Sequence, residues 1–177
     1  TLEQVVRDLQ NFCRKFMPDT LLTSRLLSED LYRNMGLQRM LWEEEDQTRL
    51  SLQQPAADIA ELSRLNTAGL SVEHVLPQNP AFDIASYGFK DAEEFEEHKH
   101  RLGNLLLLEK GLNSACQNAT VESKVTVPTL YAASGLVSVK ALAASRVGKP
   151  LGYKLENIEE RSQSLAQLML QRWPIAA

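Results

Sequence analysis

The residues with the most evident chemistry are one histidine and two asparagines next to apolar segments. His74 stands within Val-Glu-His-Val-Leu-Pro-Gln, residues 72–78, and Asn104 follows Gly103 ahead of four leucines. Asn113 comes nine positions after Asn104, beyond a Lys-Gly turn signal. A neutral imidazole accepts a proton near neutral pH, because its unperturbed pKa is about 6.5. An asparagine carbonyl oxygen is a ligand for a hard divalent cation.

A proton acceptor and a ligand for a divalent cation together suit the hydrolysis of a phosphodiester bond. A base must deprotonate water, and a cation must neutralise the charge that develops on the phosphate and on the leaving oxygen. The three residues are widely separated in the sequence, so the fold must bring them together. The local pattern around each residue indicates which element positions it.

The segment around His74 is expected to be a short strand. Residues 72–76 form a β-prone run, and Pro77 stops it. His74 therefore lies at the end of a strand, and its side chain faces away from that of Glu73.

The second asparagine is expected to follow another strand. Residues 105–108 are all leucine, a run long enough for a buried strand, and Gly103 opens it. After the Lys-Gly turn signal, Asn113 or Ser114 is expected to cap a helix. The pattern thus predicts strand, loop, strand and helix, with a polar residue at each junction.

This order resembles the ββα-metal finger of HNH endonucleases. In that family a catalytic His ends the first strand, an Asn begins the second, and an Asn or His follows at the helix. Glu-His-Val-Leu-Pro at residues 73–77, Asn104 and Asn113 match these three elements. The longer pattern of Glu-His-Val-Leu-Pro-Gln, Leu-Gly-Asn-Leu-x-Leu-Leu, Asn-Ser-x-x-x-Asn and a later Lys is similar to the C-terminal HNH domain of GmrSD-type, modification-dependent restriction enzymes, over roughly residues 36–174.

The resemblance and the chemistry together predict a role for each residue. We expect His74 to be the general base, Asn104 to orient it through a hydrogen bond to the imidazole, and Asn113 to bind the metal. Glu73 stands where many members carry Asp, and it would serve the metal directly, through water or not at all. Because these ligands offer oxygen, the metal expected is Mg²⁺, with Mn²⁺ as the alternative.

The charge distribution favours a phosphate-binding surface near these residues. The chain carries a net charge of −4, but residues 1–97 contribute −9, residues 98–154 contribute +6 and residues 155–177 contribute −1. The basic excess therefore lies with and just after the candidate site, as binding to a nucleic acid requires. The residues expected to contact DNA are Lys124, Arg101, Lys110 and Asn118.

Each candidate also has a purely structural interpretation. A lone His at a strand's end is more often structural, Asn113 is a helix N-cap by type, and Asn104 after a glycine is ordinary turn chemistry. Glu73 is equally well a solvent-facing strand residue, and Lys124 a solvated surface lysine. The spacing of His74, Asn104 and Asn113 as a set favours the catalytic interpretation.

Length and composition predict a folded domain, and the pattern of elements makes it α+β and mostly helical. The resemblance implies that a helical body carries an embedded ββα-metal (HNH) finger. The chain has 177 residues, of which 44% are hydrophobic and 24% charged, as is usual for a soluble domain. We expect a helical N-terminal part over residues 1–70, the finger over residues 71–134, and C-terminal helices over residues 135–177 that pack on the body.

Helical patterns flank the predicted finger. Apolar residues recur at helical spacing over residues 2–16, and Ser24 or Ser28 is expected to cap a second helix that runs through Trp42. The acidic run at residues 43–46 is interpreted as a solvated face or loop rather than a metal or partner site. An amphipathic helix is expected over residues 155–173.

Two further histidines lie between the predicted strands. His98 and His100 end a predicted helix over residues 91–100. Two positions apart on a helix, they do not share a face, so a metal site between them is disfavoured. We expect both to be surface or DNA-proximal residues.

The function predicted is that of a metal-dependent DNA endonuclease, the cleavage domain of a larger restriction or phage-defence protein. The resemblance implies DNA as substrate and an N-terminal domain of the same polypeptide, or a partner subunit, that selects the target. Cys13 and Cys116 form no C-x-x-C pair and no apolar run approaches about 20 residues, which favours a cytoplasmic protein without a membrane partner. The alternatives are a catalytically inactive HNH-fold module that binds DNA or protein, and a helical interaction domain with scattered polar residues.

Overall fold

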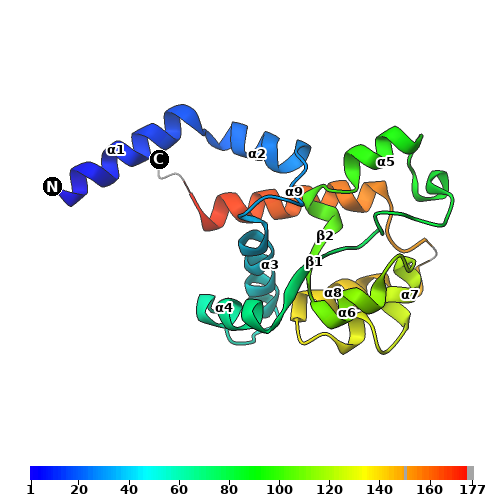
Figure 1. Ribbon diagram of the computed structural model, residues 1–177. Coiled ribbons are helices and arrows are strands. Elements are labelled where there is room, and N and C mark those ends of the chain that lie inside the picture. The colour runs from blue at the N-terminus through cyan, green and yellow to red at the C-terminus, as the bar shows by residue number, and fades with distance from the viewer. Residues whose placement is uncertain (150, 175–177) are drawn as a thin grey trace.

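Helices surround a two-stranded antiparallel sheet in the computed structural model, which describes residues 1–149 and 151–174, without the side chains of residues 66–68 (Figure 1). The strands are β1, Leu70–His74, and β2, Leu105–Glu109. The helices are α1 Leu2–Phe16, α2 Asp19–Ser28, α3 Leu37–Ser51, α4 Ile59–Ala68, α5 Ala92–His98, α6 Lys110–Cys116, α7 Val121–Thr126, α8 Val137–Arg146 and α9 Leu155–Arg172. The prediction of a mostly helical α+β fold is confirmed.

The hairpin of β1 and β2 lies at the centre of the hydrophobic core. The register pairs Leu70 with Glu109 and His74 with Leu105, so His74 ends β1 as predicted. All four leucines of residues 105–108 are buried, because helices cover both faces of the sheet. Helix α6 follows β2 directly and contacts both strands. The predicted order of strand, strand and helix is therefore present.

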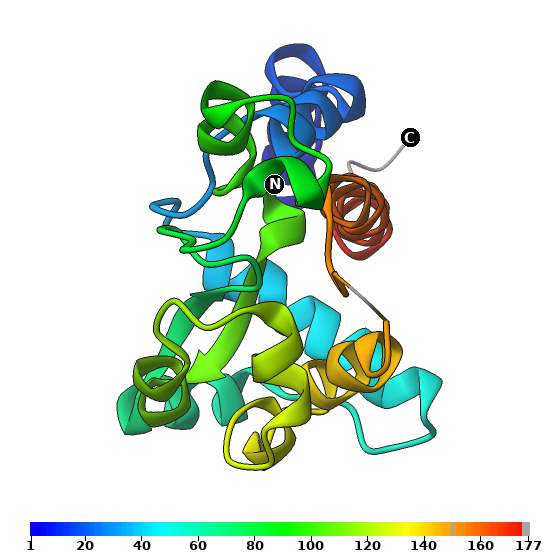
Figure 2. The ribbon, with the colours of Figure 1, turned by 90° about the vertical axis from the view of Figure 1, so that its right-hand side faces the viewer.

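Helix α9 packs against the 3₁₀ turn of residues Leu102–Asn104 that leads into β2, and Figure 2 views this helix nearly end-on. Arg161 Nη1 donates to the carbonyl oxygens of Gly103 (2.6 Å) and Leu105 (2.8 Å). The Tyr153 hydroxyl also donates to the Gly103 carbonyl, and the Gly103 N–H donates to Ser162 Oγ. This turn is thereby fixed to the C-terminal part of the chain.

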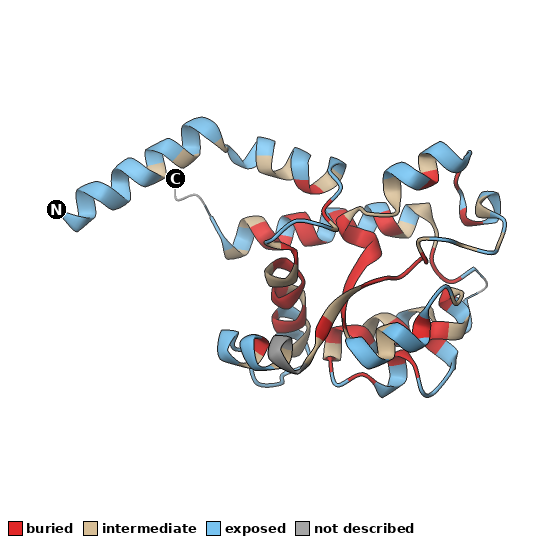
Figure 3. Cartoon of the chain, viewed as in Figure 1, coloured by how far each residue is buried: buried red, intermediate tan, exposed pale blue. Residues whose placement is uncertain are grey.

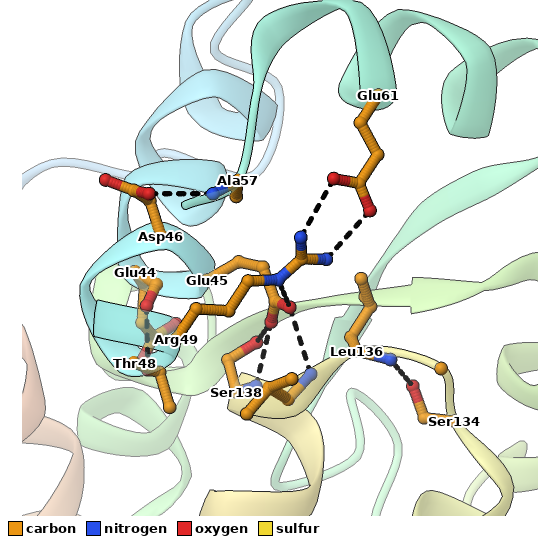
Figure 4. Close-up of polar contacts among 12 residues, drawn as sticks. Glu44, Glu45, Asp46, Thr48, Arg49, Ala57, Glu61, Ser134, Leu136 and Ser138 are labelled. Carbon is orange, nitrogen blue, oxygen red and sulfur yellow. Dashed lines mark hydrogen bonds and ion pairs between the residues drawn. The ribbon is translucent and has the colours of Figure 1, made fainter. Parts of the chain in front are cut away.

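The acidic run at residues 43–46 is neither a loop nor a solvated face, which corrects the sequence interpretation. It lies within α3, and Glu45 is fully buried. The Glu45 carboxylate accepts hydrogen bonds from the backbone N–H and hydroxyl of Ser138, at the start of α8, and from Arg49 Nε (Figure 4). Arg49 also forms two hydrogen bonds with Glu61 of α4. The acidic residues therefore join helices, which their pattern along the sequence does not indicate.

The predicted second helix is also wrong, because α2 ends at Ser28 and α3 begins at Leu37. Between them, Asn34 Oδ1 accepts a hydrogen bond from the Gly36 N–H, a turn that competes with helical hydrogen bonding. The resulting connection brings Tyr32 to the sheet. Likewise, Asn113 does not cap α6, whose N-cap is Glu109.

Helix α1 is amphipathic as predicted but extends away from the rest of the domain, and Figure 3 shows it exposed along its length. It has no buried residue, and Leu2, Leu9 and Phe12 are among its exposed apolar side chains. In the described part of the chain, no helix is both long and apolar enough to cross a membrane.

Candidate active site

His74 lies in a cluster of three aromatic rings, formed by Tyr32, His74 and His100, which we call the ring cluster. His74 Nε2 is 2.9 Å from His100 Nδ1, a hydrogen-bond distance. The Tyr32 ring stacks on His100, at 5.1 Å and 11°, and lies tilted against His74, at 4.6 Å between centroids. The three residues come from the α2–α3 connection, the end of β1 and the turn after α5.

Burial keeps the His74 imidazole neutral. The residue is only 4% exposed, and burial, reinforced by His100, Lys124 and Lys99, lowers its pKa to about 3. His74 is therefore unprotonated at neutral pH, which leaves a lone pair for a proton, and the lowered pKa also makes it a weaker base than a free imidazole.

Glu73 occupies the opposite face of β1, in a buried ion pair. Its Oε1 lies 2.7 Å from Lys124 Nζ and accepts a hydrogen bond from the Tyr131 hydroxyl at 3.2 Å. Burial raises the pKa of the Glu73 carboxyl, and Lys124 opposes that rise. Because the ammonium already holds this carboxylate, the structure does not support the prediction that Glu73 binds a metal.

Lys124 is fully buried, so the prediction that it contacts DNA phosphate is wrong. Its ammonium donates to the carbonyl oxygens of His74 (2.6 Å) and Val75 (3.2 Å) in addition to its pairing with Glu73. A full positive charge thus lies among three oxygen atoms at the end of β1, and it fixes the backbone that carries the imidazole.

Asn104 is also buried, but it holds backbone rather than the imidazole, which corrects the predicted hydrogen bond to His74. Its Oδ1 accepts from the Leu76 N–H at 2.8 Å, and its Nδ2 donates to the carbonyls of Leu76 and Lys99. The Asn104 carbonyl accepts from the Val75 N–H. Asn104 therefore joins the segment after His74 to the segment that carries His100.

Asn113 approaches β1 from the face of Glu73. Its Nδ2 donates to Ser71 Oγ (2.9 Å) and to the Val72 carbonyl (3.0 Å). Ser71 and Glu73 share a face of the strand, whereas His74 points to the other face and the ring cluster. The structure thus places Asn113, in α6, against the strand that ends with His74, without joining the two side chains.

A metal centre built by the protein alone does not follow from this arrangement. Among the described residues, no group of three or more His, Cys, Asp or Glu side chains could hold an ion. Of the two predicted ligands, Glu73 forms an ion pair with Lys124, and Asn113 donates a hydrogen bond to β1 through its Nδ2. The carboxamide oxygen of Asn113 is the part of the predicted set that fits an oxygen-preferring cation.

The other predicted DNA-contacting residues differ in their surroundings. Arg101 is half-buried, and its guanidinium donates to the carbonyls of Glu97 and Leu27, which ties the turn after α5 to α2. Lys110 and Asn118 are exposed at the two ends of the α6 region. Contact of these three residues with DNA stays a prediction.

Sequence reasoning missed His100 and Tyr32. A helix through residue 100 would place His98 and His100 on different faces, but α5 ends at His98. His98 instead bonds the Glu94 carbonyl through Nδ1, within its own helix. Two histidines at residues 98 and 100 could have drawn attention to His100 as a functional residue. The irregular connection that carries Tyr32 contains no comparable signal.

The fold and the site define a helical domain in which an antiparallel hairpin and the following helix present one neutral histidine at the end of the first strand. The chain belongs to the family described as GmrSD restriction endonucleases, C-terminal domain, whose model matches residues 19–168. This confirms the resemblance to the C-terminal domain of GmrSD-type restriction enzymes that the sequence motifs indicated. Comparison with the curated proteins and with the solved structures gave no match.

Proposed function

We propose that this domain hydrolyses phosphodiester bonds of DNA, with His74 as the general base, as the cleavage part of a larger restriction or defence protein. Membership of a restriction endonuclease family supports DNA as the substrate. The observation that carries the proposal is the neutral His74 imidazole at the end of β1, on backbone that Lys124 holds through its carbonyl.

Hydrogen bonds from Lys124 and Asn104 hold the backbone that carries the His74 base. Lys124 fixes the His74 carbonyl, and Asn104 fixes the two residues that follow, so the backbone around His74 is bonded on both sides. A base held within hydrogen-bond reach of its water contributes typically about 10²- to 10⁴-fold to a rate. The proton of the attacking water passes to a lone pair of the His74 imidazole.

A divalent cation would supply charge neutralisation at the phosphate when bound, and Mg²⁺ or Mn²⁺ stays the prediction from the oxygen ligands. Asn113 Oδ1 stays the predicted protein ligand, although Asn113 contacts the face of β1 opposite to that of His74. Because Glu73 does not fit that role, the remaining ligands would come from water and DNA phosphate.

A second candidate function is that of a binding module with an HNH-type fold and no catalysis. The burial of His74 beneath Tyr32 and His100 favours it, because a general base must reach water. The two functions differ in a cleavage assay.

Replacing His74 by alanine is expected to lower DNA cleavage at least about 100-fold, because the base is removed. The assay measures nicking and linearisation of supercoiled plasmid, with modified and unmodified bases, in Mg²⁺, Mn²⁺ or EDTA. The matched control is His98→Ala, which removes a half-buried histidine whose imidazole bonds the Glu94 carbonyl of its own helix. Equal cleavage by His74→Ala and wild type contradicts the proposal, as does a folded wild type that binds DNA without cutting it.

Replacing Asn113 by alanine is expected to lower the free energy of unfolding by about 1–3 kcal/mol, because two hydrogen bonds to β1 are lost. If Asn113 Oδ1 binds the cation, the Mg²⁺ concentration for half-maximal cleavage also rises. Thermal unfolding and a Mg²⁺ titration measure the two effects, with the exposed neighbour Ser114→Ala as control. A loss of stability with an unchanged Mg²⁺ requirement shows that Asn113 is structural only.

A further inference from the structure

The contact between His74 and His100 restricts how His74 can act. A neutral imidazole has one N–H and one lone pair, so one ring donates and the other accepts across the 2.9 Å between His74 Nε2 and His100 Nδ1. If His100 donates, the lone pair of His74 is used, and its other nitrogen carries a proton. If His74 donates, its Nδ1 keeps a lone pair that can accept a proton. Only the second tautomer allows base catalysis.

We propose that His100 is a positioning residue for His74: its Nδ1 accepts the Nε2–H of His74, which fixes the His74 tautomer and leaves Nδ1 as the proton-accepting atom. This inference rests on the proposed function for its catalytic meaning, but the tautomer itself is a property of the folded chain. It gives His100 the role that the sequence suggested for Asn104.

His100 is held firmly enough to orient a partner. The Leu31 N–H donates to the His100 carbonyl at 3.2 Å, and Asn104 Nδ2 donates to the carbonyl of the preceding Lys99. On the other side, Arg101 ties the chain to the Leu27 carbonyl. The stacked Tyr32 ring, only 11° from parallel, fixes the plane of the His100 ring.

The electrostatic surroundings of the two rings differ. His74 faces Lys124 and Lys99, which disfavour a positive charge on it. His100 is less buried than His74. Burial lowers the pKa of His100, as do Lys99 and Arg33, while the carboxylates of Asp30 and Glu96 oppose that lowering. When His74 accepts a proton at Nδ1, its Nε2–H bond can break as a bond from that hydrogen to His100 Nδ1 forms. The positive charge then lies on His100, nearer the solvent and these carboxylates.

The tautomer is tested directly by ¹⁵N NMR of the full chain, which contains only three histidines. His98→Ala and His100→Ala assign the signals. We expect an unprotonated Nδ1 and a protonated Nε2 for His74 in the wild type, and a loss of that preference in His100→Ala. A His74 ring protonated at Nδ1 in the wild type overturns the inference.

Steady-state kinetics are the second test, because a purely structural role of His100 would not lower kcat while leaving KM nearly unchanged. His100→Ala is expected to lower kcat about 10- to 100-fold, part of what base catalysis contributes, with KM changed less than about twofold. His100→Asn places an acceptor oxygen near the position of Nδ1 and is expected to recover most of the loss. His98→Ala and His98→Asn are the matched controls.

The outcomes separate the two hypotheses. Unchanged or increased kcat in His100→Ala shows that His100 merely covers the base and overturns the inference, as does failure of His100→Asn to recover activity while the variant stays folded. If wild type does not cleave DNA, the proposed function fails, and the His74 tautomer alone decides the role of His100.

Discussion

Replacing Lys124 by methionine is expected to lower the free energy of unfolding by about 3–5 kcal/mol, the range for breaking one side of a buried ion pair. The variant keeps most of the apolar stem but leaves the Glu73 carboxylate, 4% exposed, without its counter-ion. It also leaves the His74 and Val75 carbonyls without their donor. Urea denaturation measures the change, with Lys140→Met on the exposed face of α8 as control, expected within about 0.5 kcal/mol.

The double variant Glu73→Gln/Lys124→Met separates charge from packing. Removing both charges avoids an uncompensated buried carboxylate, so the double variant is expected to be more stable than Lys124→Met alone. A double variant no more stable than the single one would show that the lost carbonyl contacts, rather than the stranded charge, dominate. DNA cleavage is expected to fall in both variants, because Lys124 fixes the backbone at His74.

The defect of Lys124→Met is expected to depend on pH in a defined direction. Burial already raises the pKa of the Glu73 carboxyl, and loss of Lys124 removes the main opposing influence. A raised pKa in the folded state means that the folded chain keeps a proton that the unfolded chain releases, so stability falls as pH rises through that interval. The difference from wild type should therefore be smallest in acid and grow toward neutral pH.

These effects show which features of the site a sequence pattern can and cannot predict. The strand end at His74 and the buried run at residues 105–108 follow from local signals, a proline stop and an uninterrupted apolar segment. Family membership followed from motif spacing. The partners of each side chain could not be predicted from motif spacing, because they depend on tertiary contacts. Lys124 looks like a surface residue in the sequence, yet the fold buries it.

The same limit explains the errors at Asn104 and His100. Local pattern placed Asn104 at the junction before β2, and there it is found, but its bonds go to the backbone of Leu76 and Lys99. The ring partner of His74 comes from the turn after α5, where the helix ends two residues before a uniform pattern would end it. A two-residue difference in a helix boundary thus decided whether His100 belonged to the site.

Replacing Gly103 by alanine is expected to destabilise the domain by at least about 3 kcal/mol, at or above the upper end for overpacking a core. A Cβ atom at this position would lie 1.9 Å from the Ile158 carbonyl oxygen and 2.7 Å from Ser162 Oγ. The nearest of these is backbone of α9, so a rotamer change cannot relieve it, and helix and turn must separate. That separation would also weaken the bonds from Tyr153 and Arg161 to the Gly103 carbonyl.

Gly111→Ala is the matched control, because Gly111 lies in α6 and a Cβ there meets nothing within 4 Å. That variant is expected to be neutral or more stable by about 0.5–1 kcal/mol, since alanine favours a helix over glycine. Thermal and urea unfolding measure both.

Because Asn104 adjoins Gly103 and holds the backbone after His74, Gly103→Ala should also reduce DNA cleavage at temperatures where it stays folded. A Gly103→Ala protein as stable as Gly111→Ala would mean that α9 does not pack this closely on the turn that carries Asn104.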